Sequence, residues 1–309
     1  EVVLNPTPFY GEAGGQIGDR GVIVTDSGAK IEITECQKPV DKFTVCIGQV
    51  VEGAVSTGEQ VWAGYKPEVR KEIRAHHSAT HLLHASLSKV LGDHVKQAGS
   101  LVQEQRLRFD YSHFEALTDD KIRAIELDSN QRVLAASDIQ TEVLPFDEAK
   151  EKGAIALFGE KYGDVVRVVS MGDSVEFCGG THSKNTKDID IVLVSREEAI
   201  ASGVRRIEAE VGQSARERTK RTYSNLTTAA QMLNGEFAQE LTKDDEPALL
   251  ALNKTLKTYA DFQEQVGKLG GTSVCVDTSA AAPSLADDFG FEAAQAGRDL
   301  WQALLASVN

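Results

Sequence analysis

The stretch HHSATHLLHASL at residues 76–87 carries two histidines, His77 and His81, four residues apart within an apolar repeat. The apolar side chains around them recur at helical spacing and are Leu82, Leu83, Leu87 and Val90. In an α-helix, residues four apart lie one above the other on the same face. The stretch therefore predicts a helix over 68–91 whose paired imidazoles can hold one ion.

A second motif, FCGGTH at residues 177–182, supplies a thiol and a further imidazole, Cys178 and His182. The two glycines between them let the backbone turn sharply, so both side chains can reach a common point. Nitrogen and thiolate ligands suit zinc, whereas calcium and magnesium prefer oxygen. We therefore predict a tetrahedral zinc site made of His77, His81, Cys178 and His182.

Neither of the two motifs alone is strong evidence for a metal site. Two histidines on an amphipathic helix are more often solvated or packed than bound to metal, and a lone cysteine is usually a small buried hydrophobe. Only the two motifs together predict metal binding. We interpret His84 as a packing residue or a support for a ligand, and His76 as facing solvent or substrate.

Composition limits the class of protein. The chain has 309 residues, a net charge of −14 and four cysteines without close pairing, which is typical of a reduced cytoplasmic protein rather than a disulfide scaffold. No apolar run approaches membrane-spanning length, so no membrane partner is expected. Three cysteines are predicted to be core residues: Cys36, Cys46 and Cys275.

The pattern predicts an α+β fold in three parts. Residues 1–65 contain short β-type runs that suggest a small β-barrel-like domain. Residues 66–212 alternate helices and strands and would form a zinc-containing α/β-sandwich. Residues 213–309 are predicted to be mainly helical. Their scattered leucines could pair two chains as a homodimer, and the segment could form the start of a further small domain. The expected strands lie at 21–25, 31–34, 43–50, 60–63, 106–111, 140–144, 165–171, 189–195 and 203–211, with a helix at 119–137.

Five blocks in order carry a family resemblance: NPTPFYGEAGGQIGDRG (5–21), HHSATHLLHASL (76–87), QAGSLV with RLRFDYSH (97–113), FCGGTH (177–182) and GVRRIEAEVG (203–212). Together they resemble the editing domain of alanyl-tRNA synthetases, and freestanding proteins that deacylate mischarged alanine tRNA are similar. The editing domain of threonyl-tRNA synthetases is similar in the zinc-type motifs alone. No ATP-binding aminoacylation core is recognised, so we expect a synthetase fragment or a freestanding editing protein that does not charge tRNA.

The resemblance implies hydrolysis of the ester that joins serine or glycine to alanine tRNA. It implies catalytic roles for Gln16, Thr7, Cys178 and Asp110. It also implies substrate or tRNA contacts by Gln16, Ser100, Arg108, Arg205 and Arg206. Other readings stay open, because the Gly14–Gln16 segment and Asp19 are good turn formers and Arg108 with Asp110 could be a simple strand pair.

Alternatives remain for the role of the zinc ion and for the class of protein. Four ligands allow a zinc that only shapes the pocket, or one that yields a position to water. Instead of an editing enzyme, the chain could be a noncatalytic zinc-stapled module that binds tRNA or a partner protein. A zinc hydrolase acting on another small ester, without RNA, is a further alternative.

Overall fold

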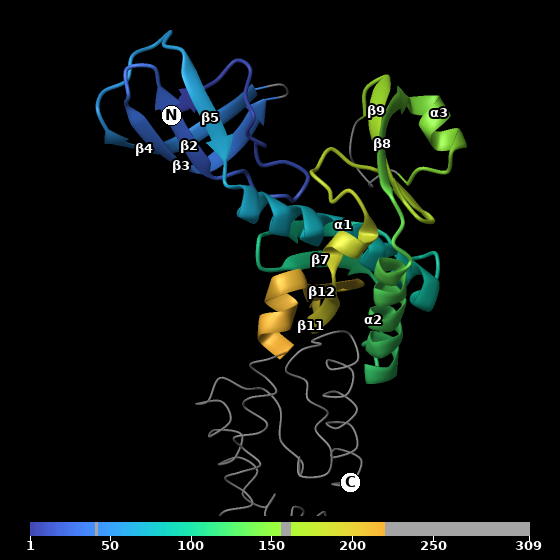
Figure 1. Cartoon of the computed structure of the whole chain (residues 1–309). Helices are drawn as coiled ribbons and strands as arrows, with labels where there is room; N and C mark the ends of the chain where they lie inside the picture. Colours follow the sequence, from blue (N-terminus) through green and yellow to red (C-terminus); the bar gives the residue numbers. More distant parts are fainter. Residues whose placement is uncertain (41–42, 156–161, 220–309) are drawn as a thin grey trace, which may run out of the picture. The chain divides into compact units, whose positions relative to one another are not determined.

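The computed structural model describes residues 1–40, 43–155 and 162–219. Residues Glu1–Ser214 form one compact unit (Figure 1). Nearly all of the predicted C-terminal region, with its helices, its homodimer surface and Cys275, lies outside the described residues. Among the described residues, no helix is long and apolar enough to cross a membrane.

The first sheet is antiparallel and has the strand order β1-β4-β3-β2-β5. Its strands are β1 (Val2–Val3), β2 (Gly21–Thr25), β3 (Lys30–Val40), β4 (Phe43–Glu52) and β5 (Val61–Tyr65). Burial alternates along the start of β3, because successive side chains of a strand point to opposite faces. The inner face packs as a small core that includes Cys36 and Cys46, which confirms their predicted burial.

Helix α1 (Pro67–Leu91) is the predicted histidine helix. It begins with a proline, whose missing N–H costs nothing at this position, and ends at Gly92, whose φ of 113° suits glycine. Every residue from Ala75 to His84 is buried. Elements on several sides cover the helix, namely α2, β6, β7, β10, β12 and the short 3-10 helix η1. A helix that carries four histidines is therefore an interior element.

A second antiparallel sheet has the order β11-β12-β7-β6 and packs against α1 and α2. Its strands and helices are β6 (Gln97–Val102), β7 (Leu107–Ser112), α2 (Asp119–Leu134), η1 (Thr186–Ile189), β11 (Val192–Ala201) and β12 (Val204–Val211). The main core lies between this sheet and the helices and includes Leu83, Phe109 and Ile207.

A third sheet of three strands has the order β10-β9-β8 and a helix at its side. The elements are β8 (Ile139–Pro145), α3 (Phe146–Glu151), β9 (Val165–Met171) and β10 (Ser174–Phe177). Strand β10 runs directly into the second metal motif, so this sheet determines where Cys178 lies.

The α+β class is confirmed, and the bounds of β2 and β9 are those predicted. The first sheet is open among the described residues, with β1 and β5 as its edge strands; its closure into a barrel and the boundaries at 65 and 212 stay predictions. Sequence reasoning missed β6, β10 and α3. Strand β6 gives a poor β pattern, because Gly99 and Ser100 interrupt its apolar residues.

A buried ion pair ties the N-terminal segment to α1. Arg70 Nε donates to Asp19 Oδ1 at 2.7 Å, and Arg70 Nη2 bonds to the other oxygen of the same carboxylate. The side chains are 7% and 3% exposed. Asp19 also accepts a hydrogen bond from the backbone N–H of Tyr10. The segment that carries the Gly14–Gln16 loop is thereby closed at its base.

We expect Asp19→Ala to lower the free energy of unfolding by about 3–5 kcal/mol, because it leaves the Arg70 charge buried without its partner. Denaturant unfolding followed by circular dichroism measures the effect. The control is Asp173→Ala, which removes a 72% exposed carboxylate from its pair with Arg132 and should cost under about 1 kcal/mol. Equal losses in the two variants would contradict the role given to the buried pair.

Candidate metal centre

The four predicted ligands converge at one point. One nitrogen or sulfur from each of His77, His81, Cys178 and His182 lies within 4.8 Å of the others. Cys178 Sγ is 3.3 Å from His77 Nε2 and 3.2 Å from His182 Nε2. The helix supplies two imidazoles on one face, with ring centroids 5.5 Å apart. The cluster could therefore hold a metal ion.

The chemistry of the donor set fits a cation. His81 Nε2 is buried and has no hydrogen-bond partner among the described residues, and burying such an atom is costly unless something binds it. Burial alone would raise the pKa of the Cys178 thiol. The neighbouring charges of His77 and His81, with hydrogen bonds from His182 and His77, instead lower that pKa to about 2. A thiolate is the form that binds metal.

The other nitrogen of each imidazole lies close to a side chain outside the cluster. Gln16 Oε1 is 2.7 Å from His77 Nδ1. Glu176 Oε2 is 2.9 Å from His81 Nδ1, and Ser78 Oγ is 3.3 Å from His182 Nδ1. Such contacts orient the rings of metal-binding histidines.

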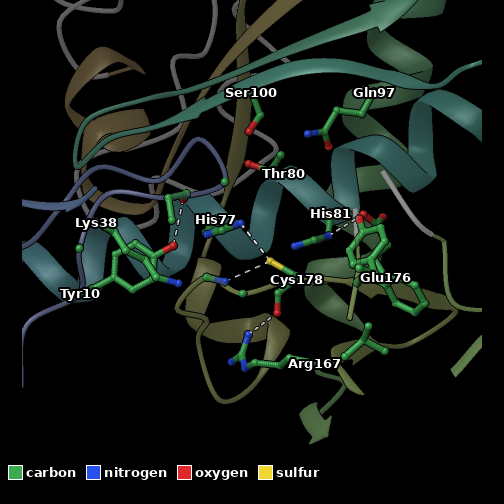
Figure 2. Close-up of a pocket in the computed structure, with 18 of the residues that line it drawn as sticks. Tyr10, Lys38, His77, Thr80, His81, Gln97, Ser100, Arg167, Glu176 and Cys178 are labelled. Atoms are coloured by element: carbon green, nitrogen blue, oxygen red, sulfur yellow. Dashed lines mark hydrogen bonds and ion pairs between the residues drawn. The ribbon is translucent and has the colours of Figure 1, made fainter. Parts of the chain in front are cut away.

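Beside the cluster lies a cavity of about 660 Å³. Figure 2 shows His77 and His81 directed toward Cys178, with Thr80, Gln97 and Ser100 above them in the view. Arg167 lies on the other side and donates to the Cys178 carbonyl oxygen at 2.6 Å. The lining also includes Tyr10 and Lys38. Three residues of the cluster, His77, His81 and Cys178, thus line a cavity of the size that small-molecule sites have.

Three predicted site residues, Ser100, Gln16 and Thr7, differ in their position relative to the cavity. Ser100 lines the cavity. Gln16 is 0% exposed and contacts His77 and Thr181, so the predicted substrate contact would require it to leave both partners. Thr7 accepts a hydrogen bond from the backbone N–H of Phe9 and is not among the residues that line the cavity.

The predicted sheet residues form ion pairs. Asp110 is 6% exposed, and both its oxygens bind Arg206, at 2.7 and 2.9 Å. Arg108 lies 3.7 Å from the same carboxylate. Arg205 is 8% exposed and binds Glu197. None of these four side chains lines the cavity, and their predicted roles stay predictions.

The remaining histidines of α1 have structural partners. His84 contacts Glu176 and the ring of Phe109, which confirms a packing and supporting role. The exposure predicted for His76 is wrong, because its ring is 0% exposed. His76 Nε2 accepts from the backbone N–H of Val211, and burial lowers the pKa of His76 to about 4. His76 does not reach solvent, because other elements cover the helix on several sides.

Sequence reasoning missed several residues of the site, and Glu176 is the main one. It is 3% exposed and pairs with both His81 and His84. Its place two residues before Cys178 was the available signal. The missed cavity residues Tyr10, Thr80, Gln97 and Arg167 carry no pattern that distinguishes them from ordinary surface or core positions.

Comparisons with known proteins agree with the motifs. Residues 166–208 match the threonyl and alanyl tRNA synthetase second additional domain, and residues 1–69 match the class II (A) tRNA synthetases. The chain is 47% identical over 258 residues to an alanine–tRNA ligase of Saccharophagus degradans, covering 83% of this chain and 29% of the relative. It is 42% identical over 301 residues to that of Nitrobacter winogradskyi, covering 93% and 33%. The chain belongs to the alanyl-tRNA synthetase family. It spans about a third of the length of these curated relatives.

We expect the purified chain, prepared without chelator, to contain about one metal ion, as one tetrahedral site requires. Cys178→Ala should lower the metal content well below that value, because it removes the charged ligand. Cys36→Ala removes a buried thiol outside the cluster and should keep the ion. Elemental analysis of the three proteins gives the result; a metal-free wild type or an unchanged Cys178→Ala variant would contradict the assignment.

Proposed function

We propose that this chain is the editing part of an alanyl-tRNA synthetase, which hydrolyses Ser-tRNA(Ala) and Gly-tRNA(Ala). The observation that carries the proposal is that His77, His81 and Cys178 of the cluster line a cavity of about 660 Å³ with polar side chains in its wall. A purely structural metal site has no need of such a cavity. Family membership supports alanine tRNA as the source of the substrate.

We propose zinc as the ion. A tetrahedral zinc with its usual bond lengths separates sulfur and nitrogen ligands by about 3.6 Å, close to the 3.3 and 3.2 Å from Cys178 to His77 and His182. Bound there, zinc would supply a Lewis acid at the cavity wall. The chain's own contribution is to orient the ester, because a hydrolytic reaction needs the carbonyl carbon held within reach of water.

Selectivity against correctly charged tRNA follows from polar groups in the cavity. A site shaped for alanine discriminates poorly against serine and cannot exclude glycine by size. The cavity offers hydrogen-bonding groups on Thr80, Gln97 and Ser100. A serine hydroxyl could pair with them, whereas an alanine side chain would leave one of them unpaired. Serine release should therefore exceed alanine release.

Positive charge at the cavity suits the terminal nucleotide. Lys38 and Arg167 both line it, and Arg167 is fixed by its bond to the Cys178 carbonyl oxygen. The net charge of −14 does not oppose this role, because phosphate contacts need only a local basic surface.

We expect the purified chain to release serine from charged alanine tRNA at least about tenfold faster than alanine, since one paired or unpaired hydroxyl is worth about 1–3 kcal/mol. Glycine has no such hydroxyl and should be released more slowly than serine. Release of radiolabelled amino acid from the three charged tRNAs measures this. Removing the metal with chelator and restoring it should abolish and restore the release.

Two results would overturn the proposal. Tight binding of metal and tRNA without release would indicate a noncatalytic binding module. Equal hydrolysis of a small seryl ester in the absence of RNA would indicate a general ester hydrolase.

A further inference from the structure

The amide of Gln16 can be oriented without ambiguity. A backbone N–H can only donate, so the Gln16 atom 2.8 Å from Thr181 N must be the oxygen Oε1. The amide nitrogen then donates to Thr181 Oγ1 at 3.0 Å. Because these contacts come from the CGGTH motif itself, the Gly14–Gln16 loop and the metal motif fix one another.

The same oxygen fixes the proton of His77. Gln16 Oε1 is also 2.7 Å from His77 Nδ1, and an amide oxygen only accepts, so Nδ1 must carry the hydrogen. In the neutral ring, which is the form that binds metal, the lone pair is then on His77 Nε2, and this is the atom that lies 3.3 Å from Cys178 Sγ. We infer that Gln16 is a positioning residue of the metal site, holding His77 in the ring orientation and tautomer that bind the ion.

The residues around Gln16 and His77 pack closely against them. Gln16 is completely buried and pairs with Val102 of β6 as an isolated bridge. Gly15 lies against Ser100, where a Cβ would be 2.3 Å from the Ser100 hydroxyl oxygen. At Gly180 a Cβ would be 2.0 Å from His77 Cε1 and 3.0 Å from Gln16 Oε1. Close packing at both glycines leaves the Gln16 amide and the His77 ring a single relative position.

This inference rests on the metal-dependent function proposed above, and it is tested without tRNA. Apo protein is titrated with Zn²⁺ against a chromogenic chelator, and the visible spectrum of the Co²⁺-loaded protein reports ligand geometry. Gln16→Met, which removes the acceptor, should weaken Zn²⁺ affinity about 10- to 100-fold. Gln16→Glu keeps an acceptor oxygen for His77 Nδ1 and should stay within about threefold of wild type, as carboxylates are common partners of metal-bound histidine.

Matched controls separate this role from general damage to the fold. Gln97→Met makes the same change at a residue that lines the same cavity and should leave Zn²⁺ affinity unchanged. Gly180→Ala should weaken binding by displacing the His77 ring, whereas Gly179→Ala meets nothing within 4 Å and should not.

The outcomes are distinct. Wild-type Zn²⁺ affinity in Gln16→Met would overturn the inference, and so would equal losses in Gln16→Met and Gln16→Glu, which would indicate that the loop fold matters rather than the acceptor. If the proposed editing activity is absent while the Zn²⁺ affinities follow the expected order, the inference stands and the proposed function fails.

Discussion

The structure depends on one constraint: side chains from α1 and from the segment after β10 must meet at a single point inside the protein. Helix α1 is covered on several sides, so its buried polar residues have no water to bind and must find partners in the chain. His76 uses the backbone of Val211, Ser86 uses Asp128, and His84 uses Glu176. These contacts fix the rotation of the helix about its axis, and that rotation aims His77 and His81 at Cys178.

The N-terminal segment is also fixed in position by contacts within the chain. Its base is closed by the Asp19–Arg70 pair, and its tip docks on β6 through backbone hydrogen bonds from Val102 to Gly15 and from Ile17 to Val102. Between these two anchors Gln16 has no freedom to point elsewhere. A loop that sequence reasoning treats as a turn or a substrate contact therefore packs directly against the candidate metal centre. Gly15 is needed because Ser100 of β6 approaches its backbone too closely for a side chain.

Much of this could be predicted from the sequence, and the failures have physical causes. Helix α1, β2 and β9 were predictable, because apolar periodicity and strand alternation are local properties. The convergence of His77, His81, Cys178 and His182 was predictable, because the two spaced motifs share one chemistry. The partner of Asp110 was not, since it depends on the register that sets Arg206 of β12 opposite it. The burial of His76 and the bridging role of Glu176 follow from which elements cover α1, and no local pattern encodes that.

The same arrangement links metal binding to folding. Three imidazoles and a thiolate brought together without an ion leave a buried nitrogen, His81 Nε2, with no hydrogen-bond partner among the described residues, at a cost of about 1–3 kcal/mol. Glu176 and Gln16 contact the rings through the chain itself, so the four side chains are brought together by the fold, and the rest of the fold meets this cost. An ion that satisfies all four ligands relieves the cost, and its binding free energy adds to the stability of the folded state. The polar interior of α1 is thus consistent with a protein whose most stable form is the one with metal bound.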